Sequence, residues 1–273
     1  MSFYQQKFEQ VELEVKNNNQ LWVTLNNPDQ MNAITTPMID SLVMILKHAD
    51  FDRDIRVIVL TGSGKAFCAG GDIKAMGEKS GMFAGESNEL RMRYMHGIQQ
   101  IPRCVEEIST PLIAMVQGAA IGAGCDLAMM CDLRVGSIHS KFSETFTRMG
   151  LVPGDGGTFF LQRVVGYSKA MQMFMTAEVF EGKKAYDFGL LNNFCDNQAL
   201  LTDETLKLAE VIASHAPIAQ SMTKKAMKTS YLHDLHTSLD TLATFQGITQ
   251  RTSDHFEALR AFLEKRPPQF KAE

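Results

Sequence analysis

Two glycine-rich turns, each placed after a run of apolar residues, are the part of this sequence best suited to chemistry. The first turn occupies residues 62–71 and follows the apolar run 57–60, and the second occupies residues 118–124 and follows the run 112–116. Small residues at the point where a strand passes into a helix leave backbone N–H groups exposed, and these can point at a developing negative charge. Two such turns on one chain predict an oxyanion hole with two backbone donors.

The elements that must position these turns predict the α/β fold class, because strand, turn and helix alternate up to about residue 200. The unit of strand, glycine turn and helix occurs twice, at 57–75 and 112–130, which indicates a repeated ββα turn. Residues 141–146 are also expected to be extended. Strands are predicted at 21–25, 56–60, 112–116 and 132–137, the second of them from its run of β-branched residues.

Helix signals lie between these strands. Thr35 and a proline in the first turn predict a helix that runs to about Ala49. The polar segment 74–98, rich in Met, Gly, Ser and Glu, is predicted to be a mobile loop that passes into a helix at 89–107. A further glycine loop is expected at 150–157. The remaining helices of this part are predicted at 125–130, 158–165, 168–176 and 183–188.

The chain is predicted to divide into an α/β core of residues 1–200 and a helical region of residues 201–273. No strand pattern remains in the second part. Helices with a wide apolar face for their size favour packing on another copy of the chain, so we expect a homo-oligomer. Apolar spacing predicts these helices at 202–214, 218–232, 235–249 and 253–264.

Composition excludes several classes of function. The chain has 273 residues with a formal net charge of -4 and mixed charges, which argues against a nucleic-acid surface. Five irregularly spaced cysteines predict reduced thiols rather than a disulfide framework, and neither they nor the histidines have metal-ligand spacing. Without a targeting pattern at the start or an apolar run long enough for a bilayer, we expect a cytoplasmic protein without a membrane partner.

Five motifs, in order along nearly the whole chain, resemble those of the crotonase, or enoyl-CoA hydratase/isomerase, family. They are residues 31–34, 66–73, 117–132, 150–157 and 262–266. The resemblance implies a spiral of ββα units whose C-terminal helices form a trimer, often a dimer of trimers. It also implies an acyl-CoA thioester as substrate. We expect no further cofactor, since neither glycine turn has the G-x-G-x-x-G pattern followed by an acidic residue on the next strand, and the lack of metal-ligand spacing predicts no metal.

The resemblance assigns the oxyanion donors to the backbone of Gly71 and Ala123. In this family the two amides grip the thioester carbonyl, where charge collects in an enolate-like transition state. The alternative is that the glycines of the two turns have only a conformational role, which is less consistent with the presence of both motifs. By the same resemblance, the residues that contact substrate or CoA are Met31, Ala33, Ala69, Gly70, Asp72, Ile73, Gly122 and Phe146.

The sequence departs from the family at the proton-transfer groups. A typical hydratase carries glutamates at the positions of Asp126 and Phe146, and a phenyl ring cannot transfer a proton. Glu144 is expected to share a strand face with Phe146. Asp155 is close in sequence to the position where dienoyl-CoA isomerases of the family carry an extra aspartate. We therefore take Asp126, Glu144 and Asp155 as catalytic candidates. The structural alternatives are a charge at a helix start for Asp126, a solvated strand residue for Glu144 and a loop cap for Asp155.

Three functions are compatible with these residues. The leading expectation is an enoyl-CoA hydratase that adds water across a 2,3 double bond, with Asp126 and Glu144 transferring protons. An enoyl-CoA isomerase is the second, because a single base can move one proton between two carbons. A CoA-binding protein without activity is the third, since Phe146 replaces a glutamate.

Overall fold

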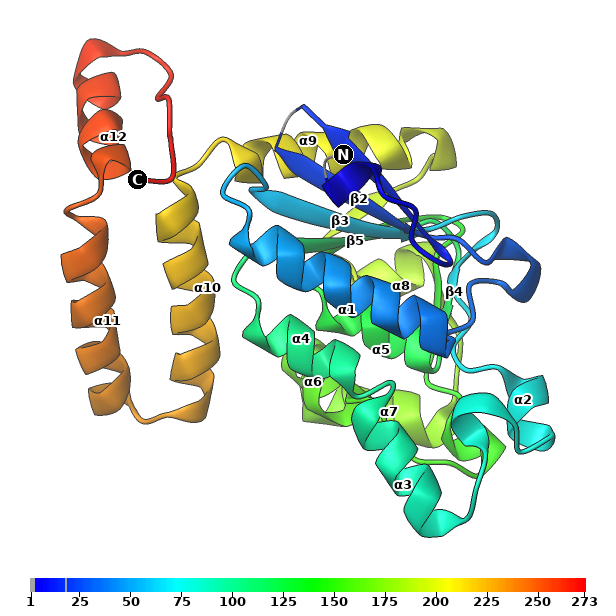
Figure 1. Ribbon diagram of the computed structural model, residues 1–273. Helices are drawn as coiled ribbons and strands as arrows, with labels where there is room; N and C mark the ends of the chain where they lie inside the picture. The colour runs from blue at the N-terminus through cyan, green and yellow to red at the C-terminus, as the bar shows by residue number, and fades with distance from the viewer. Residues whose placement is uncertain (1–2, 18) are drawn as a thin grey trace.

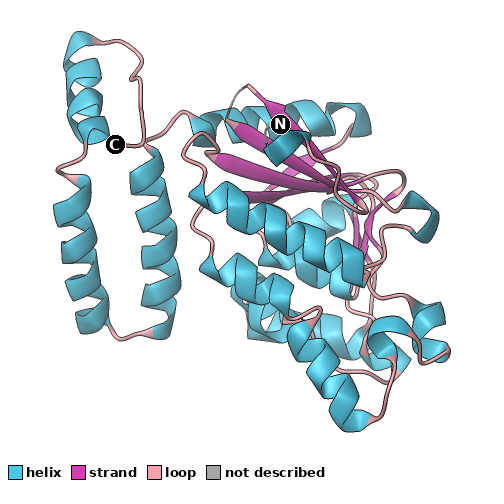
Figure 2. Ribbon diagram, in the orientation of Figure 1, coloured by secondary structure: helices cyan, strands magenta, loops and turns pink. Residues whose placement is uncertain are grey.

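The computed structural model describes residues 3–17 and 19–273, and its strands form two β-sheets (Figures 1 and 2). Neighbouring strands are parallel except for the pairs β1–β2 and β8–β9. The larger sheet contains, in spatial order, β1 (Val11–Lys16), β2 (Gln20–Leu25), β3 (Val57–Gly62), β5 (Leu112–Val116), β7 (Leu133–Ser137) and β10 (Asn193–Cys195). The smaller contains β4 (Ala66–Cys68), β6 (Ala119–Ile121), β8 (Lys141–Ser143) and β9 (Phe180–Glu181).

From β3 to β8, consecutive strands alternate between the two sheets, which confirms the repeated ββα unit. β3 lies in the large sheet and β4 in the small one, and the pairs β5–β6 and β7–β8 repeat this arrangement. The first two pairs each lead into a helix, α2 (Ile73–Gly77) and α5 (Ala123–Met130). The chain thus forms a spiral, and successive glycine turns come to lie beside each other at one edge of it.

Helices cover both faces of the large sheet. Along β3, Val57 and Val59 pack with α9 (Leu201–Ala213), while Ile58 and Leu60 face the cluster that includes α1 (Thr36–Phe51) and α5. This alternation is that of a strand buried on both sides. The predicted core ended at residue 200, yet α9 packs on the sheet as well, because its buried residues lie on one face that fits the sheet surface.

Beyond α9 the chain forms a helical arm that stands beside the core (Figure 1). It contains α10 (Pro217–Leu232), α11 (Leu235–Thr249) and α12 (Ser253–Glu264), close to the predicted bounds. The base of the arm is tied to the core by Lys224, whose Nζ lies 2.6 Å from an oxygen of Asp132. Throughout the described ranges, 3–17 and 19–273, no helix has the length and apolar character needed to cross a membrane.

The segment 74–98, predicted as a loop, contains a string of short helices. After α2 come a 3₁₀ turn (Gly81–Phe83), α3 (Ser87–His96) and, beyond Gly97, α4 (Gln100–Glu107). Asp72 caps α2 by accepting from the Ala75 N–H, and Glu86 and Glu89 form a capping box on α3. Capping groups therefore order this polar segment. The single helix predicted for 89–107 was wrong, because Gly97 leaves helical backbone geometry at φ −106° and ψ −112°.

The helices predicted at 158–165, 168–176 and 183–188 are present. They are α6 (Gly157–Val165), α7 (Tyr167–Thr176) and α8 (Gly182–Phe188). The extended segment predicted at 141–146 ends early, since strand β8 stops at Ser143. Phe146 has helical angles, φ −56° and ψ −50°, and begins a 3₁₀ turn. The prediction that Glu144 and Phe146 share a strand face is therefore wrong.

Candidate active site

The two glycine turns touch each other, and glycine is what permits the contact. A Cβ on Gly124 would lie 1.9 Å from the carbonyl oxygen of Cys68, and one on Gly70 would lie 2.6 Å from that of Ile121. Gly70 also has φ +91°, which L side chains rarely adopt. The same Cβ on Gly70 would lie 3.4 Å from the Ala123 nitrogen, so the first turn approaches the start of α5 closely.

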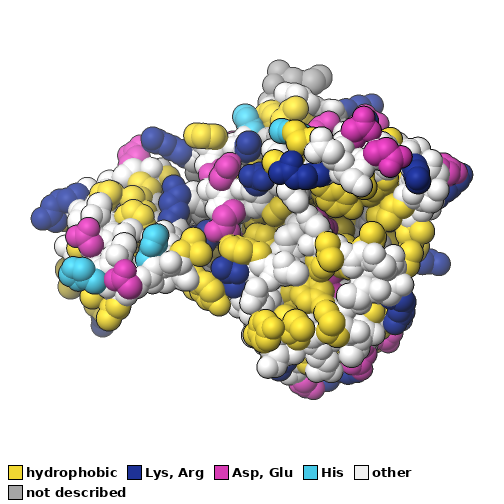
Figure 3. Space-filling model, turned by 90° about the horizontal axis from the view of Figure 1, so that it is seen from below, with side chains coloured by type: hydrophobic (Ala, Val, Ile, Leu, Met, Phe, Trp, Pro, Cys, Tyr) yellow, Lys and Arg dark blue, Asp and Glu magenta, His cyan; other side chains and the backbone are white. Residues whose placement is uncertain are grey.

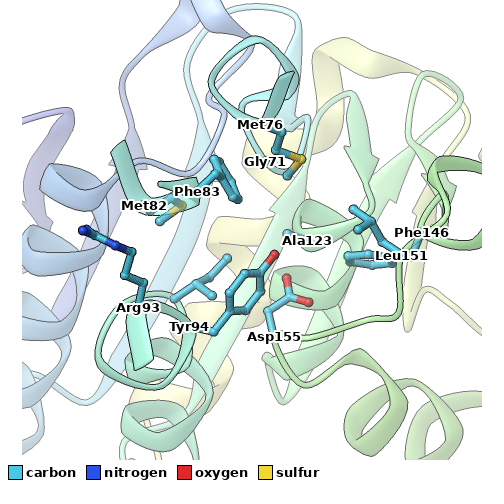
Figure 4. A pocket seen from close by; sticks show the side chains of 11 residues that line it. Gly71, Met76, Met82, Phe83, Arg93, Tyr94, Ala123, Phe146, Leu151 and Asp155 are labelled. Atoms are coloured by element: carbon cyan, nitrogen blue, oxygen red, sulfur yellow. The ribbon is translucent and has the colours of Figure 1, made fainter. Parts of the chain in front are cut away.

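Gly71 and Ala123 line one cavity, as sequence reasoning required of oxyanion donors (Figure 4). Ala123 is the first residue of α5, where helical N–H groups have no partner within the helix. Among the backbone hydrogen bonds of the described residues, none is donated by the N–H of Gly71 or of Ala123. Both groups are therefore available to a ligand oxygen.

The cavity is narrow and mostly apolar. Its volume is about 30 Å³, enough for one or two water molecules. Met76 closes it over Gly71, because a Cβ on that glycine would lie 2.5 Å from the Met76 methyl carbon. The lining residues are Gly71, Met76, Met82, Phe83, Arg93, Tyr94, Ile98, Ala123, Phe146, Leu151 and Asp155.

The three candidate carboxyl groups are all buried, but only one of them lines the cavity. Asp126 and Glu144 are 0% exposed and Asp155 is 3% exposed. Asp155 forms part of the cavity wall, and its carboxyl group points inward beside Tyr94 (Figure 4). Asp126 and Glu144 do not contribute to that wall, so Asp155 is the carboxyl placed to meet a ligand.

These carboxyl groups form a buried cluster without a counter-charge. Outside the cluster, no N–H group or hydroxyl group of another described residue donates a hydrogen bond to an oxygen of Asp126, Glu144 or Asp155. Burial raises the pKa of Asp126 well above its ordinary value, and the charges of Glu144 and Asp155 raise it further. Burial likewise raises the pKa of Glu144 to about 8 and raises the pKa of Asp155. Glu144 therefore keeps its proton at neutral pH, and Asp126 lies within hydrogen-bond distance of both Glu144 and Asp155.

The first turn of α6 places the N-terminal end of a helix against this cluster. Gly157 begins the helix, and a Cβ there would lie 1.8 Å from an Asp126 carboxyl oxygen. The positive end of a helix dipole offsets part of the cost of carboxylate charge. Among the described residues, no group of three or more His, Cys, Asp or Glu side chains is arranged to hold a metal ion.

The predicted CoA contacts lie around the first glycine turn. The Ala69 N–H donates to the carbonyl of Met31, so these two segments run side by side. Met31 and Ile73 expose their side chains at the surface, whereas Ala33 is buried. Asp72 serves as the helix cap described above.

The other two predicted contacts lie at the cavity. Phe146 is one of its walls, and its ring lies 3.9 Å from the position of a Cβ on Gly122. Gly122 has φ +53° and turns the chain into α5. An apolar ring thus lines the cavity where the family resemblance places a glutamate.

Tyr94 is the residue that sequence reasoning missed. It lies on α3, within the segment predicted as a loop, and no motif or spacing connects it with the glycine turns. Its ring packs on the backbone of Gly154, since a Cβ there would lie 2.9 Å from the ring carbon Cε1. Only the folded chain brings Tyr94 next to Asp155.

The fold belongs to a known class, since it matches solved crotonase-fold structures over nearly its whole length. An enoyl-CoA hydratase from Bacillus anthracis superimposes with a TM-score of 0.90 at 30% sequence identity, covering 97% of this chain and 100% of that one. The family model described as enoyl-CoA hydratase/isomerase matches residues 16–273. The chain therefore belongs to the enoyl-CoA hydratase/isomerase family.

Relatives with different named activities have similar sequence identity to this chain. The mitochondrial enoyl-CoA hydratase of Pongo abelii is 35% identical over 256 residues, covering 94% of this chain and 85% of that protein. The 1,2-epoxyphenylacetyl-CoA isomerase of Escherichia coli is 31% identical over 248 residues, covering 91% of this chain and 93% of that protein. The family thus includes both hydro-lyases and isomerases, and the reaction must be argued from the site.

Proposed function

We propose that this protein is an enoyl-CoA hydratase whose acid and base is Asp155. One observation carries the proposal: the Gly71 and Ala123 amides and the buried Asp155 carboxyl group line the same cavity. Relatives named as enoyl-CoA hydratases support a 2-enoyl-CoA thioester as the substrate. No metal or second cofactor is required by this chemistry.

The proposed reaction follows from where charge must collect. The thioester carbonyl oxygen lies between the two amides, and addition of water at C3 moves electron density onto that oxygen. Two fixed N–H donors stabilise the resulting enolate, and losing one such donor typically costs about 2.7–4 kcal/mol of activation free energy. Asp155 accepts a proton from the water and then donates a proton to C2. Asp126 and Glu144 do not line the cavity, and they form with Asp155 a buried cluster of carboxyl groups.

CoA binding is proposed at the surface around the first glycine turn. Met31, Ala33, Ala69 and Ile73 surround the adenine and pantetheine in this proposal, with Gly70, Asp72 and Gly122 shaping the backbone that receives them. The support is the pairing of the Met31 and Ala69 segments by a backbone hydrogen bond. A CoA thioester at saturation raises the melting temperature if this surface binds it.

Double-bond isomerisation is the second candidate, and a specific observation favours it. Phe146 stands in the cavity wall, and a single carboxyl group, that of Asp155, lines the cavity with it. One base suffices to carry a proton between C2 and C4, whereas hydration also needs a polar group that holds water. The E. coli isomerase named above is a relative of this chain.

Turnover of two substrates tests the proposal. Purified protein is given crotonyl-CoA and, separately, a 3-enoyl-CoA, and products are separated by chromatography. We expect faster hydration of crotonyl-CoA, with a loss of about 10²–10⁴-fold in kcat for the Asp155→Asn variant. Preferential isomerisation supports the second candidate, and binding without any turnover contradicts both.

The active form is proposed to be a homo-oligomer, a trimer or a dimer of trimers. The arm exposes large apolar side chains, among them Leu235, Phe262 and Leu263. An apolar groove of about 940 Å³ lies between α10 and the core, and hydrophobic side chains gather on both parts (Figure 3). Sedimentation of the purified chain measures the oligomeric state directly.

A further inference from the structure

Tyr94 lines the same cavity as the amides of Gly71 and Ala123, and nothing in the motif pattern assigns it a role. Its ring lines the cavity, and its hydroxyl group points inward beside the Asp155 carboxyl group (Figure 4). The Tyr94 hydroxyl group makes no hydrogen bond to another described residue. A polar group in a largely apolar wall, with its hydrogen-bonding capacity unused, is available to a ligand or a water molecule.

The neighbouring carboxyl group has the Asp126 carboxyl group beside it and no other side-chain partner among the described residues. Asp155 is 3% exposed, and no N–H group or hydroxyl group of another described residue donates a hydrogen bond to its oxygens. Tyr94 and Asp155 are close enough for their charges to interact, yet no direct hydrogen bond joins them. With about 30 Å³ of cavity around them, the pair fits one or two water molecules.

Both groups are held rigidly with respect to each other. The Tyr94 ring packs on Gly154, the residue before Asp155. Gln99, which follows α3, donates a hydrogen bond from its side chain to the Gly154 carbonyl at 2.8 Å, and its own N–H donates to the Tyr94 carbonyl at 3.1 Å. The end of α3 thus clamps the loop that carries Asp155, which is the preorganisation that a water site requires.

We infer that Tyr94 is a positioning residue that holds the attacking water against Asp155. It thereby supplies the water contact that Phe146 cannot make. This inference rests on the proposed hydration, and it names the second polar group that hydration needs. Burial raises the pKa of Tyr94, and the charge of Asp155 raises it further, so the hydroxyl group keeps its proton at neutral pH.

The step balances with one water and one carboxylate. The water donates one hydrogen bond to the Tyr94 oxygen and the other to Asp155. The water oxygen forms a C–O bond at C3, and the water O–H bond that faces Asp155 breaks as its proton passes to the carboxylate. The π electrons of the double bond move into the enolate, whose oxygen is held by Gly71 and Ala123. Asp155 then delivers its proton to C2, which regenerates the carboxylate, and no atom is oxidised or reduced.

Two reactions measured side by side test this role. Hydration of crotonyl-CoA needs the positioned water, whereas exchange of the C2 protons of butyryl-CoA in D₂O needs only the base and the oxyanion amides. Tyr94→Phe removes the hydroxyl group and keeps the ring that packs on Gly154. We expect Tyr94→Phe to lower kcat for hydration at least about tenfold with KM nearly unchanged, and to change the exchange rate less than about threefold.

Two further variants make the result decisive. Asp155→Asn is expected to lose both reactions, and Tyr167→Phe, which alters an exposed tyrosine on α7, is expected to lose neither. Hydration by Tyr94→Phe at the wild-type rate, or an equal loss of hydration and exchange, overturns the water-positioning role. A wild-type protein that does not hydrate crotonyl-CoA overturns the proposed function itself, and the Tyr94 role with it.

Discussion

Gly157 and Asp126 are in direct contact across the junction of α6 and α5. A Cβ built on Gly157 would lie 1.8 Å from the Asp126 oxygen Oδ1 and 2.3 Å from its Cγ. The start of α6 therefore packs on the carboxyl group without room for a side chain. This contact fixes the middle member of the buried cluster, and any residue larger than glycine must displace it.

The first prediction concerns this contact. Gly157→Ala is expected to destabilise the protein by about 1–3 kcal/mol, because the added methyl group overpacks a buried site. The free energy of unfolding in urea measures the effect. Gly247→Ala is the matched control, since Gly247 lies within α11 with open space around it. There the change is expected to be neutral or to stabilise by about 0.5–1 kcal/mol. Equal effects at both positions contradict the prediction.

The second prediction concerns the pH dependence of stability. Burial raises the folded-state pKa of Glu144 to about 8 from its ordinary value of 4.5. Between these values the folded state keeps a proton that the unfolded state has lost, so the stability from this group falls as pH rises. It is fully present below the ordinary pKa and lost as pH passes through about 8.

Urea unfolding at a series of pH values measures this slope. Glu144→Gln removes the titrating group, so its free energy of unfolding is expected to fall less steeply with pH than that of the wild type. Glu78→Gln, at an exposed glutamate, is the matched control. A slope that is unchanged in Glu144→Gln shows that Glu144 ionises alike in both states.

The third prediction concerns the approach of the two glycine turns. Gly70→Ala is expected to lower both stability and crotonyl-CoA hydration, because its Cβ would meet the Ile121 carbonyl oxygen and push the turns apart. Gly150→Ala is the control for backbone strain alone, since Gly150 has φ +71° and nothing within 4 Å of an added Cβ. It is expected to cost about 1–2 kcal/mol of stability. A Gly70→Ala protein with full hydration activity contradicts the proposed oxyanion hole.

The fourth prediction concerns chain length. Met76 caps the cavity above Gly71 and leaves room for only one or two water molecules, so we expect a short acyl group to be preferred. Met76→Ala is expected to raise the ratio of kcat/KM for 2-octenoyl-CoA to that for crotonyl-CoA at least about tenfold, because room for several methylene groups appears. Met44→Ala, at an exposed methionine on α1, is the control. An unchanged ratio in Met76→Ala indicates that the acyl chain leaves the cavity by another side.

Local patterns in the sequence were sufficient to predict the repeated ββα unit and its glycine turns, and the family resemblance added the spiral. The strands at 112–116 and 132–137, the helix start at Thr35 and the arm helices lie within a few residues of their predicted bounds. Apolar periodicity and capping depend on neighbouring residues, so they can be recognised without the fold. The motifs also placed Gly71 and Ala123 in separate turns whose meeting could be expected.

Long-range packing decided what the sequence left open. No local pattern shows that strand β8 stops at Ser143, that Glu144 turns inward, or that Asp155 alone lines the cavity. Tyr94 is separated from Asp155 by most of two ββα units, and only closure of the spiral brings them together. The glycine turns were determined by the sequence itself because backbone conformation is local. The partners of each carboxyl group were decided by the tertiary structure, because burial and charge depend on every element packed around them.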